Sequence, residues 1–193
     1  MARSSHRHIL FIVIILLIVS ISGYFLWLNS LSYNGANGQD TGRNFIFTTI
    51  DDTTQELRDY RGKVVIMDLW ATWCGPCQYQ MVEFIKIYEN YTRDELEIFS
   101  VNMDARDTNQ DIQDFIDEFA TYGYSLDWVF INDDGSIWDE YMMDRGAIPT
   151  VHIFDQKGNL YDSYEGLSFY DELPDGAPED SKRLVPILDE LLG

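Results

Sequence analysis

Segments with the hydrophobic pattern of strands alternate with segments that have the pattern of helices along most of this chain. The segment from Val64 to Trp70 is apolar on both faces apart from Asp68, which is typical of a central strand in a sheet covered on two sides. Such alternation predicts an α/β fold class with a central sheet. Further strands are expected at residues 45–50, 96–103, 128–131, 150–154 and 160–164, the last two joined by a hairpin around Gly158.

Three helices are predicted from apolar residues that recur at intervals of three and four. The first covers residues 78–90, the second follows a capping box at Thr108 to Asp111, and the third lies at the end of the chain. Pro186 falls within the first part of the last helix, so its starting residue stays open. The apolar positions are Met81, Phe84, Ile85 and Tyr88 in the first helix, Ile112, Phe115, Ile116 and Phe119 in the second, and Leu184, Ile187, Leu188 and Leu191 in the third.

The N-terminus carries an uncharged apolar run of 20 residues, positions 9–28. At about 1.5 Å per residue a helix of this length spans the hydrocarbon core of a bilayer, about 30 Å. A cleaved signal peptide is the competing interpretation, but the run is long for one and Ser20-Ile21-Ser22 is a poor cleavage site. The sequence therefore predicts a cytoplasmic N-terminus (1–8), a transmembrane anchor (9–28), a flexible linker (29–43) and one domain (44–193).

Charge supports an orientation for this anchor and excludes some partners. Arg3 and Arg7 precede the run and no Lys or Arg follows it until Arg43, so the C-terminal domain is expected outside the cytoplasm, attached to the cell membrane by a single span. The whole chain has 33 acidic and 13 basic residues, a net charge of −20. A surface of this sign repels nucleic acids and anionic lipids, so no nucleic-acid partner is expected.

The two cysteines of the chain, Cys74 and Cys77, form a C-x-x-C pair, and three kinds of chemistry use such a pair. A zinc site needs two more ligands, and the domain offers no other cysteine and only His152. A structural disulfide across so short a loop would stabilise the fold little. The third possibility, a dithiol that cycles with its disulfide, is favoured, so no cofactor beyond the Cys74–Cys77 disulfide is expected.

The position of the pair on the predicted fold supports redox chemistry. Cys74 falls at the N-terminus of a helix, where free N–H groups and the helix dipole favour a thiolate, and Pro76 falls in the first turn. Cys77, one turn later, is expected to be less exposed and to resolve a mixed disulfide. Asp68 should lie near Cys77 and exchange its proton, because burial raises the pKa of a carboxyl group. An aspartate held by hydrogen bonds, or at a fraying strand end, remains the alternative.

The segment VVIMDLWATWCGPC (64–77) closely resembles the active-site segment of thioredoxins. Its longer context, LRDYRGKVVIMDLWATWCGPC (57–77) together with GAIPTVHIFDQKGNL (146–160) and Gly166, resembles the membrane-anchored thioredoxin-like proteins of the TlpA/ResA type. The resemblance implies a thioredoxin fold with an extra helix and strand between Asp104 and Pro149. It also implies a transmembrane dithiol that donates electrons, protein disulfides as substrates, and a role in cytochrome c maturation.

The resemblance also assigns roles to individual residues. Cys74 would be the attacking thiol and Cys77 the resolving thiol, with Pro149 as a cis proline opposite the disulfide. The backbone of Ile148 would pair with the substrate chain, and Trp73 would flank the thiols as a contact surface. Gly75 and Pro76 are the thioredoxin choice between the cysteines, which is similar to reducing members of the superfamily.

The sequence departs from these families at three places. Asp68 stands where many proteins of the TlpA/ResA type have asparagine, so it is similar to thioredoxins here, which supports the predicted proton exchange. Ser100 stands where thioredoxins have a lysine beside the aspartate, and Gln80 stands where the TlpA/ResA type has an acidic residue, so no role is transferred to Gln80. The function predicted is a membrane-tethered enzyme, a thiol–disulfide oxidoreductase that reduces protein disulfides. A disulfide oxidase or isomerase of the same fold and a non-catalytic interaction module remain alternatives, because redox direction depends on thiolate stabilisation more than on the motif.

Overall fold

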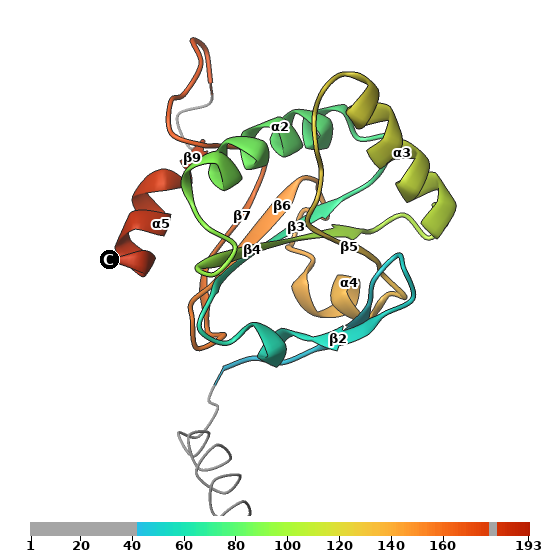
Figure 1. Cartoon of the computed structure of the whole chain (residues 1–193), viewed down its shortest axis with the longest axis horizontal. Coiled ribbons are helices and arrows are strands. Elements are labelled where there is room, and N and C mark those ends of the chain that lie inside the picture. Colours follow the sequence, from blue (N-terminus) through green and yellow to red (C-terminus); the bar gives the residue numbers. More distant parts are fainter. Residues whose placement is uncertain (1–41, 178–180) are drawn as a thin grey trace, which may run out of the picture. The chain divides into compact units, whose positions relative to one another are not determined.

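A mixed sheet of five strands forms the centre of the molecule in the computed structural model, which describes residues 42–177 and 181–193 (Figure 1). Its central strand pairs in parallel with one neighbour and antiparallel with the other, and every residue of it is buried. The apolar run therefore forms a strand covered on both faces, as its sequence predicts. In spatial order the strands are β5 (Val129–Asn132), β4 (Leu96–Asn102), β3 (Val64–Trp70), β6 (Thr150–Phe154) and β7 (Leu160–Glu165).

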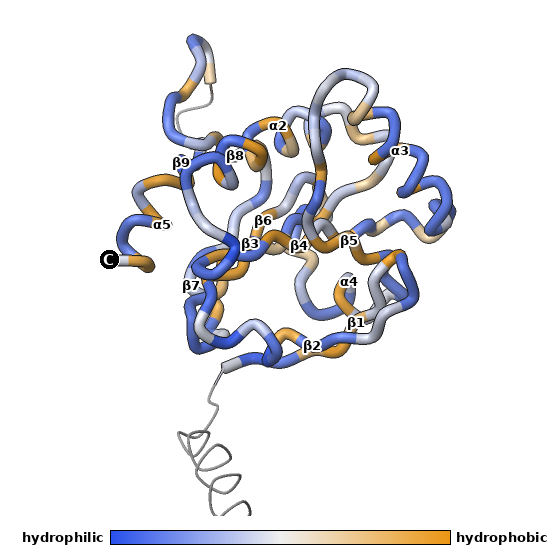
Figure 2. Tube along the Cα trace, viewed as in Figure 1, coloured by the Kyte–Doolittle hydropathy of each residue, from blue (hydrophilic) through white to orange (hydrophobic). Residues whose placement is uncertain are grey.

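Helices cover one face of this sheet, and a hairpin and a short helix lie on the other, so the domain has a separate core on each side (Figure 1). Alternate residues of β3 enter alternate cores: Ile66 and Trp70 face the first, and Met67 and Leu69 the second. Hydrophobic positions gather along the strands and polar ones along the loops (Figure 2). The first face carries α2 (Gly75–Asn90), α3 (Asn109–Thr121) and α5 (Val185–Leu192); the second carries β1 (Ile46–Thr48), β2 (Thr54–Glu56), η1 (Leu57–Tyr60) and α4 (Ser136–Tyr141).

The sequence predicts the main helices and strands, with small errors at their ends. The capping box before α3 is present: the Thr108 side chain accepts from the Asp111 N–H, and the Asp111 carboxylate accepts from the Thr108 N–H. The helix α2 begins at Gly75, three residues before the predicted start at residue 78. Pro76 is accommodated in its first turn, because an N–H group at that position has no partner within the helix. The last helix begins at Val185 with Pro186 in its first turn for the same reason.

The sequence pattern did not predict several short elements. The turn signal at Asp133–Gly135 also starts a helix, α4, because the Asp133 carboxylate accepts from the N–H groups of Ile137 and Trp138. With α3 and β5, this helix occupies the stretch between Asp104 and Pro149 that exceeds a minimal thioredoxin. The hairpin strand β2 and the pair β8 (Ser168–Phe169) and β9 (Lys182–Arg183) were also missed, since two or three residues show no period.

The predicted anchor and linker, positions 9–28 and 29–43, lie almost entirely outside the described residues. In residues 42–177 and 181–193, no helix has both the length and the apolar composition to cross a bilayer. The described residues belong to one compact unit, Thr41–Gly193. The membrane-spanning segment therefore stays a prediction from the sequence.

Candidate active site

The two cysteines lie at the junction of β3 and α2 and form a disulfide, with their Cα atoms 5.2 Å apart. Cys74 is the N-cap residue of α2. Its sulfur accepts a hydrogen bond from the Cys77 N–H at 3.2 Å. A negative charge on this sulfur would be stabilised by that N–H and by the positive end of a 16-residue helix. The local structure thus places the sulfur where a thiolate is favoured.

The two sulfurs differ in their access to solvent. Cys74 is 4% exposed and Cys77 is fully buried. Gly75 and Pro76, which separate them, are exposed, and so is Trp73 on the other side of Cys74. A partner that approaches this rim therefore reaches Cys74 first, in agreement with the predicted order of the two thiols.

The loop that carries Trp73 is held from both sides. The Thr72 N–H donates to the Asp107 carboxylate at 3.1 Å, and the Thr72 carbonyl accepts from the side chain of Gln78 at 3.1 Å. The Asn102 side chain donates to the same carboxylate of Asp107 at 2.8 Å. Hydrogen bonds from the ends of β4 and α2 therefore fix the segment that leads into the disulfide.

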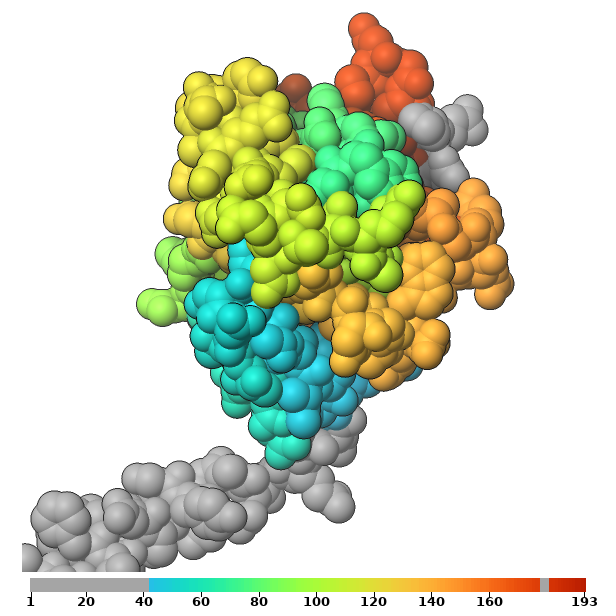
Figure 3. Space-filling view, turned by 90° about the vertical axis from the view of Figure 1, so that its right-hand side faces the viewer, coloured from blue at the N-terminus to red at the C-terminus, as the bar shows by residue number. Residues whose placement is uncertain are grey.

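The segment that precedes β6 completes the rim. The Ile148–Pro149 peptide bond is cis, as the resemblance implied, and the Ile148 carbonyl oxygen lies 4.0 Å from the Cys74 sulfur. A space-filling view shows the start of α2, the segment after β4 and the segment that leads to Pro149 side by side on one face (Figure 3). The structure therefore brings the predicted substrate-binding residues together: Trp73, Gly75, Pro76, Ile148 and Pro149.

Asp68 lies in the middle of β3 on the face covered by α2, between Ile66 and Trp70 of the same core as Cys77. Its side chain is completely buried, and neither carboxylate oxygen has a hydrogen-bond partner among the described residues. This burial raises the pKa of Asp68 well above its usual value. Asp68 does not lie at a strand end, and no described residue donates a hydrogen bond to its side chain.

Ser100, which replaces the lysine of thioredoxins, stands directly opposite Asp68 on the neighbouring strand β4. Its hydroxyl accepts from the indole N–H of Trp128 at 2.9 Å. Asp68 therefore has no cation beside it in the register of β4, and this leaves its carboxyl protonated over a wider range of pH than a lysine neighbour would.

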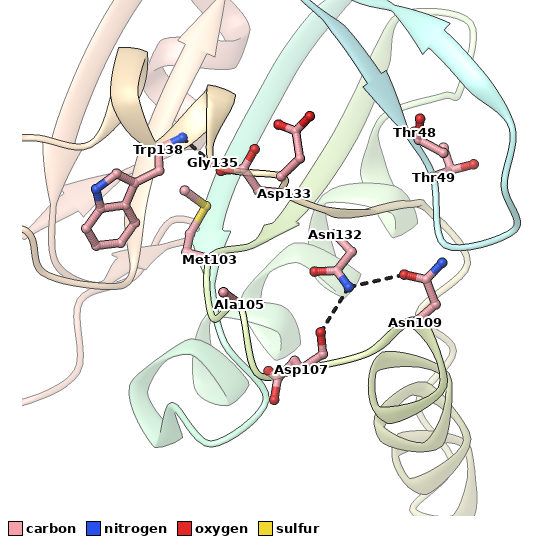
Figure 4. A pocket seen from close by; sticks show the side chains of 11 residues that line it. Thr48, Thr49, Met103, Ala105, Asp107, Asn109, Asn132, Asp133, Gly135 and Trp138 are labelled. Carbon is pink, nitrogen blue, oxygen red and sulfur yellow. Dashed lines mark hydrogen bonds between the residues drawn. The ribbon is translucent and has the colours of Figure 1, made fainter.

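Sequence reasoning missed the far wall of the groove beside the disulfide. A cavity of about 210 Å³ runs from Trp73 and Ile148 to Trp138 of α4. It continues toward a larger cavity of about 600 Å³, which Met103, Ala105 and Trp138 also line (Figure 4). The sequence did not predict that Trp138 lines this groove, because it lies 64 positions after Cys74, on a helix that the pattern did not predict. Its place is set by the α4 cap.

The larger cavity is lined by polar side chains that already bond to the protein. Asn132 donates to the Asp107 carbonyl and to the Asn109 side chain at 3.0 and 3.1 Å (Figure 4). Asp133 accepts from two N–H groups of α4. Within residues 42–177 and 181–193, no three His, Cys, Asp or Glu side chains gather in a way that would hold a metal ion.

An ion pair that the sequence did not predict anchors Trp73. The indole N–H donates to the Asp104 carboxylate at 2.6 Å, and the Arg106 side chain binds the same carboxylate at 2.9 and 2.5 Å. Hydrogen bonds from Arg106, and the one from Trp73, hold the pKa of Asp104 well below its usual range. Trp73 is 62% exposed, so its position above the rim depends on Asp104 rather than on burial.

Comparison with known proteins agrees with this geometry. Residues 39–163 match the AhpC/TSA family. The ResA thiol–disulfide oxidoreductase of Geobacillus thermodenitrificans is 27% identical over 160 residues, which cover 82% of this chain and 87% of that protein. The thioredoxin-like protein YneN of Bacillus subtilis is 27% identical over 157 residues, 78% of this chain and 87% of that protein.

Solved structures show the same fold. The crystal structure of StoA from Bacillus subtilis has a TM-score of 0.53 and 23% identity, covering 66% of this chain and 91% of that one. A thiol-disulfide isomerase from Corynebacterium glutamicum has a TM-score of 0.59 and 19% identity, covering 80% of this chain and 98% of that one. The thioredoxin-like fold with its central mixed sheet is thus confirmed. With its Cys74–Cys77 disulfide, the chain belongs to the AhpC/TSA family and is a thioredoxin-like thiol–disulfide oxidoreductase.

Proposed function

We propose that this protein reduces protein disulfides outside the cytoplasm, tethered to the membrane by residues 9–28. The observation that carries the proposal is the Cys74–Cys77 disulfide at the start of α2, with one sulfur at an accessible rim and the other buried. The names of its relatives support the thiol–disulfide chemistry, and the apolar run with its basic N-terminal flank supports the tether.

The exchange proceeds in two steps, each an attack of a thiolate on a disulfide. The Cys74 thiolate attacks one sulfur of the substrate disulfide, a mixed disulfide forms, and the other substrate sulfur leaves as a thiolate. The Cys77 thiolate then attacks the Cys74 sulfur, closes the disulfide seen here and releases the second substrate thiolate. Two electrons pass from the protein to the substrate, whose two thiolates take up protons.

Asp68 supplies the proton chemistry that the buried sulfur needs. Cys77 has no access to solvent, so its thiol must lose its proton inside the protein before it attacks. The Asp68 carboxyl lies in the same buried region with no hydrogen-bond partner among the described residues and a raised pKa. A carboxyl that titrates closer to neutrality than usual accepts the proton from Cys77 and returns it in the next cycle.

The groove beside the disulfide is the docking site for the substrate chain. An extended segment pairs with the backbone of Ile148, and apolar side chains on either side of the substrate cysteine pack against Trp73 and Trp138. The net charge of −20 favours substrates that carry basic residues. By resemblance, apocytochrome c is a candidate substrate, and a transmembrane dithiol protein is the candidate electron donor.

Reduction of insulin disulfides by the purified full chain tests the activity. Wild type is expected to catalyse reduction by dithiothreitol, while Cys74→Ser gives no rate above background because the attacking sulfur is gone. Cys77→Ser is the matched variant, since it still attacks but cannot resolve and should accumulate mixed disulfides. An active Cys74→Ser protein would contradict the assignment of the two thiols.

Two measurements decide the direction and the location. Equilibration with glutathione should give a reduction potential nearer to thioredoxin than to strong oxidants, and a value near −120 mV would indicate an oxidase instead. In intact cells, a membrane-impermeant maleimide should label Cys74 after mild reduction. Labelling only after lysis would contradict an extracytoplasmic domain.

A further inference from the structure

A tyrosine on β7 lies in the same row of the sheet as Asp68. In the strand register Asp68 stands opposite Val151 of β6, and Val151 stands opposite Tyr164 of β7. Side chains in one such row point to the same face, and two strand spacings separate the first and last by about 10 Å. Tyr164 and Cys77 also belong to the same buried core. Two long or polar side chains therefore extend into one region beneath α2 from opposite sides of Val151.

The polar groups of this region have few partners among the described residues. Neither oxygen of the buried Asp68 has a hydrogen-bond partner there, and the buried hydroxyls of Tyr164 and Ser168 have none outside their own pair. Buried polar groups in folded proteins are nearly always bonded, so such a cluster calls for a functional explanation. The Trp70 indole N–H lacks a partner too, but its ring packs against Phe115 and Phe130, toward α3 and β5.

The two titratable groups of the cluster interact electrostatically. Burial chiefly raises the pKa of the Tyr164 hydroxyl, the neighbouring Ser168 hydroxyl lowers it, and the charge of Asp68 raises it further. Both side chains belong to the same buried region, and an ionised Asp68 would attract the Tyr164 hydroxyl proton.

Ser168 is tied to the helix that carries the disulfide. The Gln80 side chain donates to the Ser168 carbonyl at 3.0 Å and accepts from the Ser168 N–H at 2.7 Å. Gln80 is fully buried and follows Cys77 by three residues, about one turn. The cluster is thus held at a fixed place relative to Cys77, through the residue at which the sequence departs from the TlpA/ResA type.

The surroundings of Asp68 contain few other charges. From β4 it meets Ser100, and from β6 the apolar Val151, while Leu184, which precedes α5, and Leu188 of α5 pack on the same face. Tyr164 faces two charges: the Lys182 ammonium lies 5.6 Å from the centroid of its ring, and the charge of Asp162 raises the pKa of its hydroxyl. The charged groups of the neighbouring elements have partners of their own. Glu83 of α2 pairs with Lys86 and the Tyr170 N–H, and Asp162 of β7 pairs with Lys182 of β9.

We propose that Tyr164 is a positioning residue for the proton step: its hydroxyl, supported by Ser168, donates a hydrogen bond to the Asp68 carboxylate once Asp68 has ionised. The donation occurs directly or through one bound water, and it sets the pH at which Asp68 can take the proton of Cys77. This inference rests on the role proposed above for Asp68. Tyr164 takes the place that a cation beside the aspartate would fill, since Ser100 carries no charge.

The rate of insulin reduction by the reduced protein, followed from pH 5.5 to 9, tests the inference. Without its hydroxyl donor the carboxylate is harder to form, so Tyr164→Phe should move the acid limb of the profile to higher pH by about one unit. Tyr141→Phe is the matched control, because it also removes the hydroxyl of a buried tyrosine but lies in the opposite core. That control should leave the profile unchanged.

A double-mutant cycle separates a link to Asp68 from general damage. In an Asp68→Asn background, Tyr164→Phe should cause no further shift of the profile. An equal effect in both backgrounds, or a Tyr164→Phe profile that superimposes on wild type, would overturn the inference.

A second readout does not depend on reductase activity. The pH dependence of the difference in unfolding free energy between the wild type and Asp68→Asn reports the pKa of Asp68 in the oxidised protein. Tyr164→Phe should raise that pKa, and an unchanged value refutes the link even if insulin proves not to be a substrate. Failure of insulin reduction with a raised pKa would instead overturn the proposed function and leave the Tyr164–Asp68 link standing.

Discussion

Each face of the central sheet buries a titratable side chain carried by an inner strand, Asp68 on one face and His152 on the other, and the two differ in their surroundings. Asp68 of β3 faces α2 and the disulfide, while His152 of β6, opposite Met67, faces the other core. The His152 ring nitrogen Nδ1 lies 2.7 Å from the Ser163 hydroxyl, and its ring packs 5.5 Å from that of Tyr141. Among the described residues, Asp68 has no such bond.

The comparison shows how burial acts in opposite directions on an acid and a base. Burial lowers the pKa of His152 to about 4, so the imidazole is neutral at pH 7 and costs the fold little there. Burial raises the pKa of Asp68, so the carboxyl sheds its proton only at a cost to the folded state. These surroundings fit a packing role for His152 and the proton exchange proposed above for Asp68.

The largest expected effect is on turnover. Asp68→Asn keeps the shape of the side chain but cannot accept a proton, so the rate of insulin reduction at pH 7 should fall by about 100-fold. His152→Gln, on the other face, should stay within about twofold of the wild type. The comparison breaks if both variants lose the same activity, because burial alone would then explain the requirement.

Stability at acid pH should depend on the face that carries His152 rather than on the face that carries Asp68. Between the unfolded pKa of histidine, about 6.5, and the folded value of about 4, the unfolded state binds a proton that the folded state does not, so stability falls as the pH falls. His152→Gln removes this term. From pH 7 to pH 4 its unfolding free energy in urea should drop by about 2–3 kcal/mol less than that of the wild type. An identical drop would show that His152 is accessible to protons in the folded state.

The local patterns of the sequence predicted the first face better than the second. The segment from Val64 to Trp70 is an unbroken apolar run, and Cys74, Gly75 and Pro76 mark the start of a helix, so the disulfide and its buried aspartate follow from residues close in the chain. The second face is built from short pieces. The helix α4 has six residues and starts at a signal that also describes a plain turn.

Contacts between segments distant in the chain could not be predicted from local sequence patterns either. Trp73 and Asp104 are 31 positions apart, and Gln80 and Ser168 are 88 apart. Neither pair has a spacing that repeats, and each depends on the order of strands in the sheet. The register of β3, β6 and β7 was required to place Tyr164 on the same face and in the same row as Asp68, because a shift of one residue turns that side chain to the other face.

A smaller effect on stability should distinguish Asp68 in the opposite pH range. Above the unfolded pKa of aspartate, about 4, the folded state holds the Asp68 proton more tightly than the unfolded chain, so stability falls as the pH rises toward the folded pKa. Asp68→Asn abolishes this loss. At pH 8 the variant should be more stable than the wild type by about 1–2 kcal/mol, and the difference should vanish near pH 4. A variant that is less stable at pH 8 would mean that the ionised carboxylate is held better in the folded protein than in water, in contradiction to a raised pKa.

The smallest expected effect lies at the rim and concerns substrate binding rather than protons. Asp104→Asn weakens the hold on the Trp73 indole, so kcat/KM for a peptide disulfide should fall by about two- to fivefold, the scale of one hydrogen bond. Arg106→Ala is the matched control, because it removes the other partner of Asp104 and leaves the indole bond in place. Since Asp104 is remote from the buried cluster, the acid limb of the pH profile should not move in either variant. A shift of that limb in Asp104→Asn would show that the rim and the buried aspartate act as one unit, and the separation of binding from proton transfer would then have to be abandoned.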